Sequence, residues 1–196
     1  MKLAMLGFGH IKTYDRMVNR SFTPFPILTT ERLTLRQLST DDGQNIFALR
    51  SDTEINKYLD RQASKTIEDA INFINKINDS IKKNDSIYWA ITLTNSKIFV
   101  GTICLFDFSN EKNKCEIGYE LLTNFQGQGI MKEAIRKVID YAFQTIRLKK
   151  IEAFTHNGNQ SSTKLLTKFD FKKSIEADKE NPEYNIFILT NSLESI

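Results

Sequence analysis

The sequence predicts a mixed α/β fold in which a central, mostly antiparallel sheet of about seven strands carries helices on both faces. Short runs rich in β-branched and aromatic residues alternate with segments whose apolar residues recur at helical spacing. The predicted order of elements, β, α, α, β, β, β, α, β, α, β, β, places three consecutive strands in the middle of the chain, which indicates a mixed sheet. With 196 residues, we expect one domain with one core.

The first predicted strand and the two helices after it lie between residues 32 and 83. Apolar and polar residues alternate over 32–38, as in a half-buried strand. Ser39 can cap the helix that follows, since Asp41 and Asp42 then lie in its first turn, where negative charge is favoured. A longer helix is predicted over 66–83, because six apolar residues there share one helical face.

The rest of the chain predicts an antiparallel meander followed by alternating elements. Strand-like runs at 87–94, 98–108 and 115–122 are joined by polar turns. A glycine loop and helix follow over 127–146, then a strand over 150–155 and a short helix over 161–168. Two further strands are predicted over 169–174 and 184–189.

Residues 1–26 are expected to form an N-terminal extension, and residues 27–196 the single domain. The extension ends in a segment with Pro24 and Pro26, and prolines interrupt regular backbone hydrogen bonding. The chain carries 27 basic and 24 acidic residues, a net charge of +3, and residues 1–30 alone account for four basic residues against one acidic residue. The remainder is therefore balanced, which argues against a nucleic-acid-binding face.

The cysteine and histidine content predicts neither a disulfide framework nor a metal site. The chain has two cysteines, Cys104 and Cys115, and two histidines, His10 and His156, too few for a ligand cluster. No signal peptide or membrane-spanning run is evident, so a cytoplasmic protein that does not bind membranes is expected.

The segment from Gly118 to Ala134 predicts an anion-binding site. It runs from a strand through a turn with Gly127 and Gly129 into a helix, and such a turn presents backbone N–H groups at the positive end of the helix. It has no Gly-Lys-Ser/Thr sequence, which a nucleotide P-loop requires. The expected anion is therefore a phosphate of a ligand bound without a metal, and coenzyme A is one candidate.

At this point the sequence resembles a known family. The run Gln-Gly-Gln-Gly-Ile-Met at 126–131 is similar to the pyrophosphate loop of the GNAT N-acetyltransferases. Residues 30–36, 116–119 and 129–134 resemble the RimJ/RimL-type branch, and residues 159–171 resemble its second motif. The resemblance covers about residues 28–190. Met131 stands where the pattern has glycine or alanine, and Asp170 replaces a glycine, which is tolerable because aspartate accepts a left-handed turn better than most residues.

The resemblance implies a function and a set of cofactor contacts. The function is transfer of an acetyl group from acetyl-CoA to a primary amine, by direct attack in a ternary complex without a metal. The implied cofactor-binding residues are Leu121, Leu122, Thr123, Gln126, Gly127, Gln128, Gly129, Ile130, Met131, Asn159 and Ser162. A covalent enzyme intermediate is not expected, since each cysteine lies in an apolar strand without an adjacent histidine.

Three residues are candidates for proton transfer. Many relatives protonate the leaving thiolate with a tyrosine at the position of Leu166, and Ser162 is the expected substitute here. Glu116 and Glu120 share a strand face near the expected amine, so either is a candidate base, with a water chain as the alternative. Tyr119, on the opposite face, is assigned to packing.

One histidine and four further aromatic residues can be assigned either to the site or to the structure around it. His156 ends the strand before the second motif, where a structural role is the expectation. Trp89, Tyr88, Phe73 and Phe47 can line an acceptor pocket or belong to the core.

Two other functions remain open from the sequence. The first is an inactive acyl-CoA-binding or acyl-CoA-sensing protein of the same fold, and the second is a protein that binds a different nucleotide phosphate with the glycine turn. The expected partner of an enzyme is an amine, either a peptide N-terminus or a small molecule, and the expected state is a monomer or a homodimer.

Overall fold

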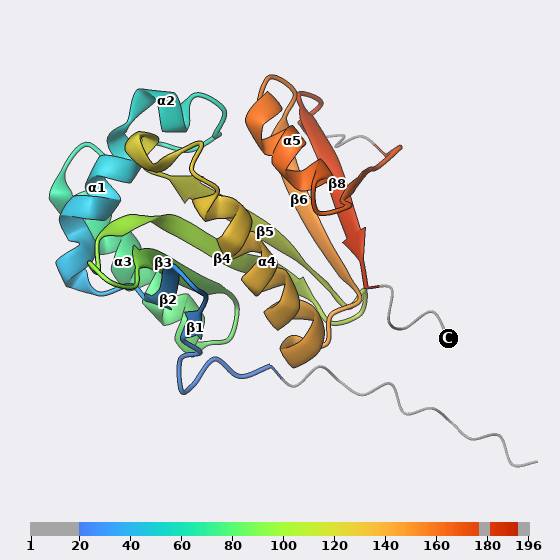
Figure 1. The fold of residues 1–196 in the computed structure, drawn as a ribbon, viewed down its shortest axis with the longest axis horizontal. Coiled ribbons are helices and arrows are strands. Elements are labelled where there is room, and N and C mark those ends of the chain that lie inside the picture. Colours follow the sequence, from blue (N-terminus) through green and yellow to red (C-terminus); the bar gives the residue numbers. More distant parts are fainter. Residues whose placement is uncertain (1–19, 177–180, 192–196) are drawn as a thin grey trace, which may run out of the picture.

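The computed structural model describes residues 20–176 and 181–191, which form one eight-stranded sheet with helices against it (Figure 1). Across the sheet the strands follow the order β1-β2-β3-β4-β5-β6-β8-β7. Their bounds are Leu28–Thr29 (β1), Leu33–Gln37 (β2), Ile87–Leu93 (β3), Phe99–Ser109 (β4), Lys114–Leu121 (β5), Lys150–His156 (β6), Lys172–Lys173 (β7) and Tyr184–Thr190 (β8).

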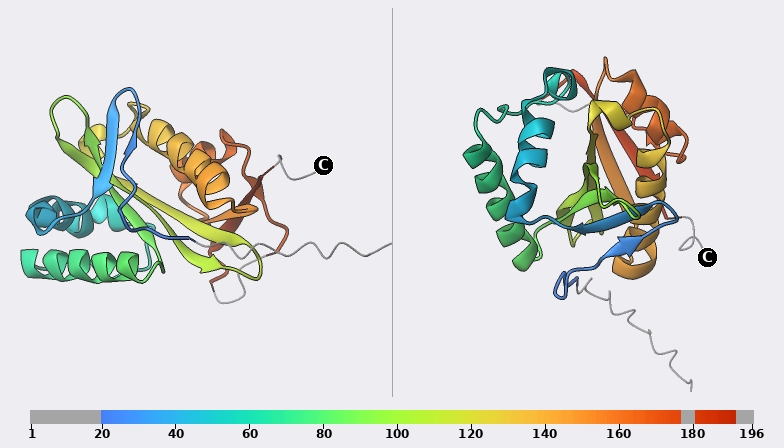
Figure 2. Two further views of the ribbon diagram at one scale, coloured as in Figure 1. Left: turned by 90° about the horizontal axis from the view of Figure 1, so that it is seen from below. Right: turned by 60° about the vertical axis from the view of Figure 1, so that its left-hand side comes forward.

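The helices cover both faces of the sheet, as predicted. Helices α1 (Gly43–Ser51) and α3 (Ile67–Lys82) lie on one face, and α4 (Ile130–Asp140) and α5 (Gln160–Thr167) lie on the other (Figure 2). The short helix α2 is Thr53–Asn56, and two 3₁₀ turns, η1 and η2, are Thr40–Asp42 and Thr123–Phe125. A π-helical turn, η3, extends α4 over Tyr141–Ile146.

The predicted mixed fold is confirmed, and the predicted meander is antiparallel. Strands β2 to β5 pair successively in antiparallel register, and β6 pairs antiparallel with β8. Among the described strands, β5 and β6 form the parallel pair. The additional strand β1 was not predicted, because two residues are too few to show an alternating pattern.

Helix α3 shows how local sequence determines an element of this fold. The Thr66 side chain accepts a hydrogen bond from the Asp69 N–H (3.1 Å), and the Asp69 carboxylate accepts one from the Thr66 N–H (2.9 Å). This reciprocal capping box satisfies two otherwise unpaired donors where the helix begins. Ala70, Ile74 and Ile81 are buried, so the predicted apolar face packs into the core.

The end of the predicted N-terminal extension packs against the domain. Phe22 is 1% exposed and lies beside Phe108, with ring centroids 5.8 Å apart. The Phe22 N–H donates to Asn84 Oδ1 (2.8 Å), and Trp89 Nε1 donates to the Pro26 carbonyl (2.8 Å). The core therefore begins at Phe22, before the predicted boundary at residue 27, whereas residues 1–19 of the extension lie outside the described part of the chain.

Replacing Phe22 by alanine is expected to lower the free energy of unfolding by about 3–4 kcal/mol, because a fully buried ring leaves a cavity. Urea denaturation measures this loss. Ile27→Ala is the control, since that side chain is 64% exposed and should change stability by less than about 0.5 kcal/mol. Equal, small losses in both variants would show that residues 20–26 contribute little to the fold.

Candidate functional site

The site is located where β5 and β6 diverge. The two strands pair only at Lys114 with Lys150, Cys115 with Ile151 and Glu116 with Glu152. Strand β5 then continues to Leu121 and β6 to His156 without further pairing to each other, and β6 runs away from β5 toward α5, beside β8 (Figure 1). The β6-facing edge of β5 after Glu116 therefore has no strand partner in the described part of the chain.

This divergence leaves a backbone donor of β5 available at Leu121. The Leu122 N–H donates to the Val100 carbonyl on the β4 side (2.9 Å). Because successive peptide groups of a strand point to opposite edges, the Leu121 N–H points toward the opening. The Leu121 carbonyl accepts from Gln126 Nε2 (3.1 Å). Of the three residues expected to offer backbone contacts, Leu121 has an open N–H, Leu122 is paired, and Thr123 begins the turn η2.

The glycine loop lies between β5 and α4. Gly127 and Gly129 have φ angles of 75° and 76°, a left-handed conformation that favours glycine. A Cβ atom at Gly127 would meet nothing within 4 Å, so the loop surface there is open. Gly129 is the N-cap of α4 and has no side chain to accept from the N–H groups of the first turn. These groups, and the positive end of the helix, are available to an anion.

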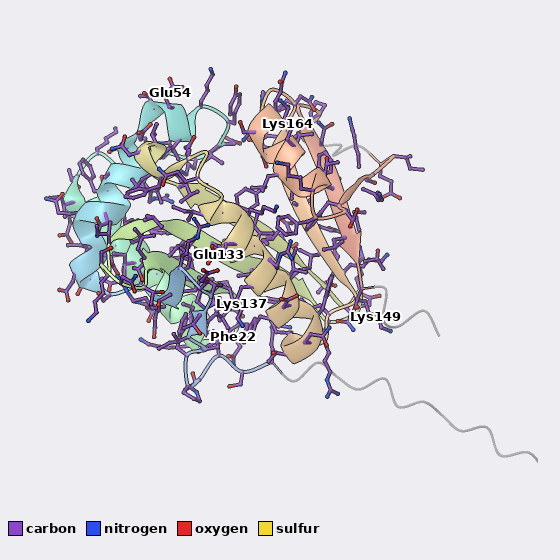
Figure 3. The ribbon with its side chains drawn as sticks, viewed as in Figure 1. Phe22, Glu54, Glu133, Lys137, Lys149 and Lys164 are labelled. Atoms are coloured by element: carbon purple, nitrogen blue, oxygen red, sulfur yellow. The ribbon has the colours of Figure 1, made fainter. Side chains whose placement is uncertain are left out.

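Polar contacts from the start of the domain hold the glycine loop. Glu133 of α4 lies on the side of that helix that faces the β2 end of the sheet (Figure 3), and its carboxylate accepts from the Thr30 hydroxyl and from Arg32 Nε (2.7 Å). Arg32 also donates to the Gln128 carbonyl (3.3 Å). Met131 is buried, so its side chain leaves the loop surface clear.

Helix α5 brings Ser162 to the opening. Asn159 is its N-cap, and Asn159 Oδ1 accepts from the Ser162 N–H (3.0 Å). The Ser162 and Tyr119 hydroxyls are hydrogen-bonded at 2.8 Å, across 43 positions of sequence. Burial raises the pKa of Tyr119 to about 12, so its hydroxyl stays protonated. Leu166, at the position of the family's tyrosine, is buried and offers no hydroxyl.

A cavity of about 420 Å³ opens beside this point, with β5 as one wall. It is lined by charged and aromatic residues that include Arg50, Asp60, Arg61, Phe73, Tyr88, Tyr119, Glu120 and Tyr184. Arg61 donates to both carboxylate oxygens of Glu120, each at 2.6 Å, and the two side chains are 17% and 12% exposed. The cavity therefore holds a fixed ion pair next to the diverging strand.

Two of the four aromatic residues suggested for a pocket lining are found there, namely Phe73 and Tyr88. Trp89 is instead fully buried beside Tyr141, with ring centroids 5.6 Å apart, and Phe47 packs against the core. His156 has structural contacts, since its Nδ1 accepts from the Gly158 N–H (3.0 Å).

The two candidate carboxylates occupy different surroundings. Glu120 lines the cavity, whereas Glu116 lies at the closed end of the divergence, in register with Glu152. The separation of four residues along a strand corresponds to roughly 13 Å. Burial, and next the negative charge of Asp107, raise the pKa of Glu116 to about 7. Glu116 thus has a pKa suited to a general base, whereas Glu120 is the carboxylate that lies in the cavity.

Glu116 should make stability depend on pH. Its folded pKa of about 7 exceeds the ordinary value of 4.5, so the native state binds this proton more tightly. The resulting stabilisation is complete below about pH 4.5 and is lost as pH rises through 7. From about pH 5 to pH 8 the free energy of unfolding should fall by about 1 kcal/mol, since solvent screens part of the interaction.

In Glu116→Gln this fall should be absent, and urea denaturation at several pH values measures it. Glu111→Gln is the control, because Glu111 is exposed and the variant should keep the wild-type slope. A Glu116→Gln protein with the wild-type slope would contradict the shifted pKa.

The described residues offer little for metal or thiol chemistry. No group of three His, Cys, Asp or Glu side chains suited to a metal occurs within residues 20–176 and 181–191. Burial raises the pKa of the Cys104 thiol to about 12 and also raises that of Cys115, so neither thiol is an activated nucleophile. In the same ranges, every helix is too short or too polar to cross a membrane.

The chain is similar to known proteins over most of its length. Residues 32–172 match the acetyltransferase (GNAT) domain family. The uncharacterized N-acetyltransferase YoaA of Bacillus subtilis is 34% identical over 149 residues, which are 76% of this chain and 84% of that protein.

Solved structures share the fold at lower identity. The ribosomal-protein-S5-alanine acetyltransferase of Vibrio fischeri has a TM-score of 0.74 at 22% identity and covers 85% of this chain and 97% of its own. The RimL ribosomal L7/L12 α-N-protein acetyltransferase in complex with coenzyme A also has a TM-score of 0.74, at 18% identity over 84% of this chain and 98% of its own.

Proposed function

Because the chain belongs to the GNAT acetyltransferase family, we propose that it transfers an acetyl group from acetyl-CoA to a primary amine by direct attack in a ternary complex. The observation that carries this proposal is the open N–H of Leu121, which lies between the glycine loop and a cavity of about 420 Å³. A donor in that position can stabilise the oxyanion that develops during acyl transfer. No metal is needed for this chemistry.

The residues at the opening fit coenzyme A. The exposed loop from Gln126 to Gly129 and the first turn of α4 offer N–H groups to a pyrophosphate, and no Cβ atom at Gly127 obstructs them. Ile130 and Met131 would contribute through their backbone, since both side chains are buried. When bound, acetyl-CoA supplies the acetyl group as a thioester.

Asn159 and the end of β5 would hold the pantetheine arm. Asn159 Oδ1 already caps α5, which leaves its Nδ2 to donate to an amide carbonyl. The backbone contact expected from Leu121, Leu122 and Thr123 is proposed at Leu121, because the Leu122 N–H already donates to Val100.

Ser162 and Tyr119 are proposed to return a proton to the leaving thiolate. Their hydroxyls are 2.8 Å apart, so either one can donate while the other accepts. Because burial keeps Tyr119 protonated, the pair always holds a proton for the thiolate. Ser162 is the donor in this proposal, and Tyr119 replenishes it.

Glu120 is proposed to receive and orient the amine. Its carboxylate lines the cavity and is held by Arg61 on both oxygens, so it is fixed in a position to accept a hydrogen bond from the incoming amine. Glu116 lies roughly 13 Å along the strand from Glu120. It would therefore act on the amine only through a chain of water molecules.

A second candidate function is an acyl-CoA-binding protein without turnover. The observation that favours it is that Glu120, the carboxylate that β5 contributes to the cavity, has both oxygens bound by Arg61. Such a protein would bind coenzyme A at the same loop but would lack an efficient base.

The test is an assay of thiol release from acetyl-CoA with peptides and small amines as acceptors, run beside thermal stabilisation by coenzyme A. The proposal predicts amine-dependent thiol release and stabilisation that grows with ligand concentration. Stabilisation without release for every amine would support the binding protein. Stabilisation by ATP with magnesium, but not by acetyl-CoA, would contradict both functions.

We further propose that the protein acts in the cytoplasm as a monomer or homodimer. Its thiols are free in the structure, as expected in a reducing compartment. Both a peptide N-terminus and a small molecule remain acceptors under this proposal.

A further inference from the structure

Arg50 places an unpaired cationic side chain in the cavity. It lies at the end of α1, and its Cζ atom is 3.9 Å from the centroid of the Phe73 ring. Its Nε atom is buried and has no hydrogen-bond acceptor among the described residues. Its two Nη atoms also form no hydrogen bond or ion pair with the described residues, so the part of the guanidinium group that lines the cavity has no partner among them.

The other charged groups of the cavity do not supply that partner. Glu120 has both oxygens bound by Arg61, which also donates to Asn56 Oδ1 (2.7 Å). Asp60 is exposed and is not among the charges that act on Arg50. Burial lowers the pKa of Arg50 and the positive charge of Arg61 adds to that effect, whereas the negative charge of Glu120 acts against it. An arginine nevertheless remains protonated in proteins, so Arg50 keeps a charge in the cavity that forms no direct ion pair with the described residues, although Glu120 and Asp60 also line it.

The position of Arg50 is fixed by its surroundings. Its backbone carbonyl accepts from the Ser64 N–H (3.1 Å) and from Asn56 Nδ2 (2.9 Å). The ring of Phe73 covers one face of the guanidinium group, so the N–H edge is the part that can meet a ligand. A guanidinium group held in this way can donate two parallel hydrogen bonds to a planar group with two oxygen atoms.

We propose that the amine substrate carries a carboxylate group and that Arg50 binds it. This inference rests on the proposed function and names its substrate class as small amino acids. A carboxylate matches the planar guanidinium edge in shape, and its single charge matches the single charge of Arg50. The cavity volume of about 420 Å³ suits a small molecule. The amine end would then face Glu120 and the opening of β5.

The experiment compares matched acceptors that differ only in the anionic group, such as an ω-amino acid and its carboxamide. Calorimetry measures their binding to the protein saturated with coenzyme A, and thiol release measures kcat/KM. The wild type is expected to prefer the carboxylate by roughly 10-fold or more in both readouts. Arg50→Gln should abolish that preference and leave the carboxamide nearly unchanged.

Two further variants keep the test decisive. Lys57→Gln removes an exposed charge outside the cavity lining and should retain the preference. Arg50→Lys, which keeps the charge without the planar fork, should retain part of it and serves if Arg50→Gln does not fold.

The outcomes separate this inference from the proposed function. Equal binding of both acceptors by the wild type, or a preference that survives in Arg50→Gln, would overturn the inference. A carboxylate preference in binding, lost in Arg50→Gln, with no turnover of any amine, would support the Arg50 site and reject the enzymatic function.

Discussion

Replacing Ser162 by alanine is expected to lower kcat by roughly 100-fold while the Kd for coenzyme A changes by less than about threefold. The substitution removes the hydroxyl that faces the opening and leaves Tyr119 without its hydrogen-bond partner at 2.8 Å. The capping bond of α5 uses the Ser162 backbone N–H, so the helix should persist. Thiol release gives kcat, and calorimetry gives the Kd.

The neighbouring serine provides a matched control. Ser161 is exposed on the same helix, and Ser161→Ala should keep the wild-type kcat. Tyr119→Phe should also lower kcat, and the double variant should lose little more than Ser162→Ala, because the two hydroxyls act as one unit. A wild-type kcat in Ser162→Ala would reject the proton-donor role, and additive losses would show that the two hydroxyls act separately.

Replacing Gly127 by valine is expected to weaken coenzyme A binding by roughly 100-fold. A β-branched residue is strained at a φ of 75°, and its side chain would occupy the open space in which the pyrophosphate is proposed to lie. The strain alone should lower the free energy of unfolding by about 1–2 kcal/mol. Calorimetry and urea denaturation measure the two effects separately.

Gly127→Asn distinguishes backbone strain from obstruction of the ligand. Asparagine accepts a positive φ better than most residues, and this fold already has Asn84 and Asn113 at φ angles of 60° and 46°. Gly127→Asn should therefore regain most of the stability but not the affinity. Wild-type affinity in both variants would place the cofactor elsewhere.

The fold could be predicted from the sequence because its signals are local. The helical stripe of α3 and the runs of β-branched and aromatic residues in the meander are features of neighbouring residues, and both occur where they were expected. The strand predicted over residues 169–174 is reduced to Lys172–Lys173, and β1 was missed, because such short pairings depend on the partner strand rather than on their own sequence. The burial of Phe22 was missed for the same reason, since its neighbours Asn84 and Phe108 are distant in sequence.

The glycine loop was predictable for a similar reason, since two glycines before a helix are a local pattern. The side-chain constellation was not. Strand parity separates Tyr119 from Glu120, and only the divergence of β5 from β6 allows both to reach one cavity. The Arg61–Glu120 pair and the unpaired Arg50 depend on how α1 and the chain after α2 pack on the sheet. No periodicity in the sequence encodes those contacts.

The acyl-CoA site at the opening of β5 can be observed directly by recording backbone amide resonances during a titration with coenzyme A. The proposed site predicts that the largest changes occur at Leu121 and at residues 127–131, with little change at Gly43, which lies in α1 on the other face of the sheet. Changes confined to other surfaces, or none at saturating ligand, would contradict the proposed site and both functions that depend on it.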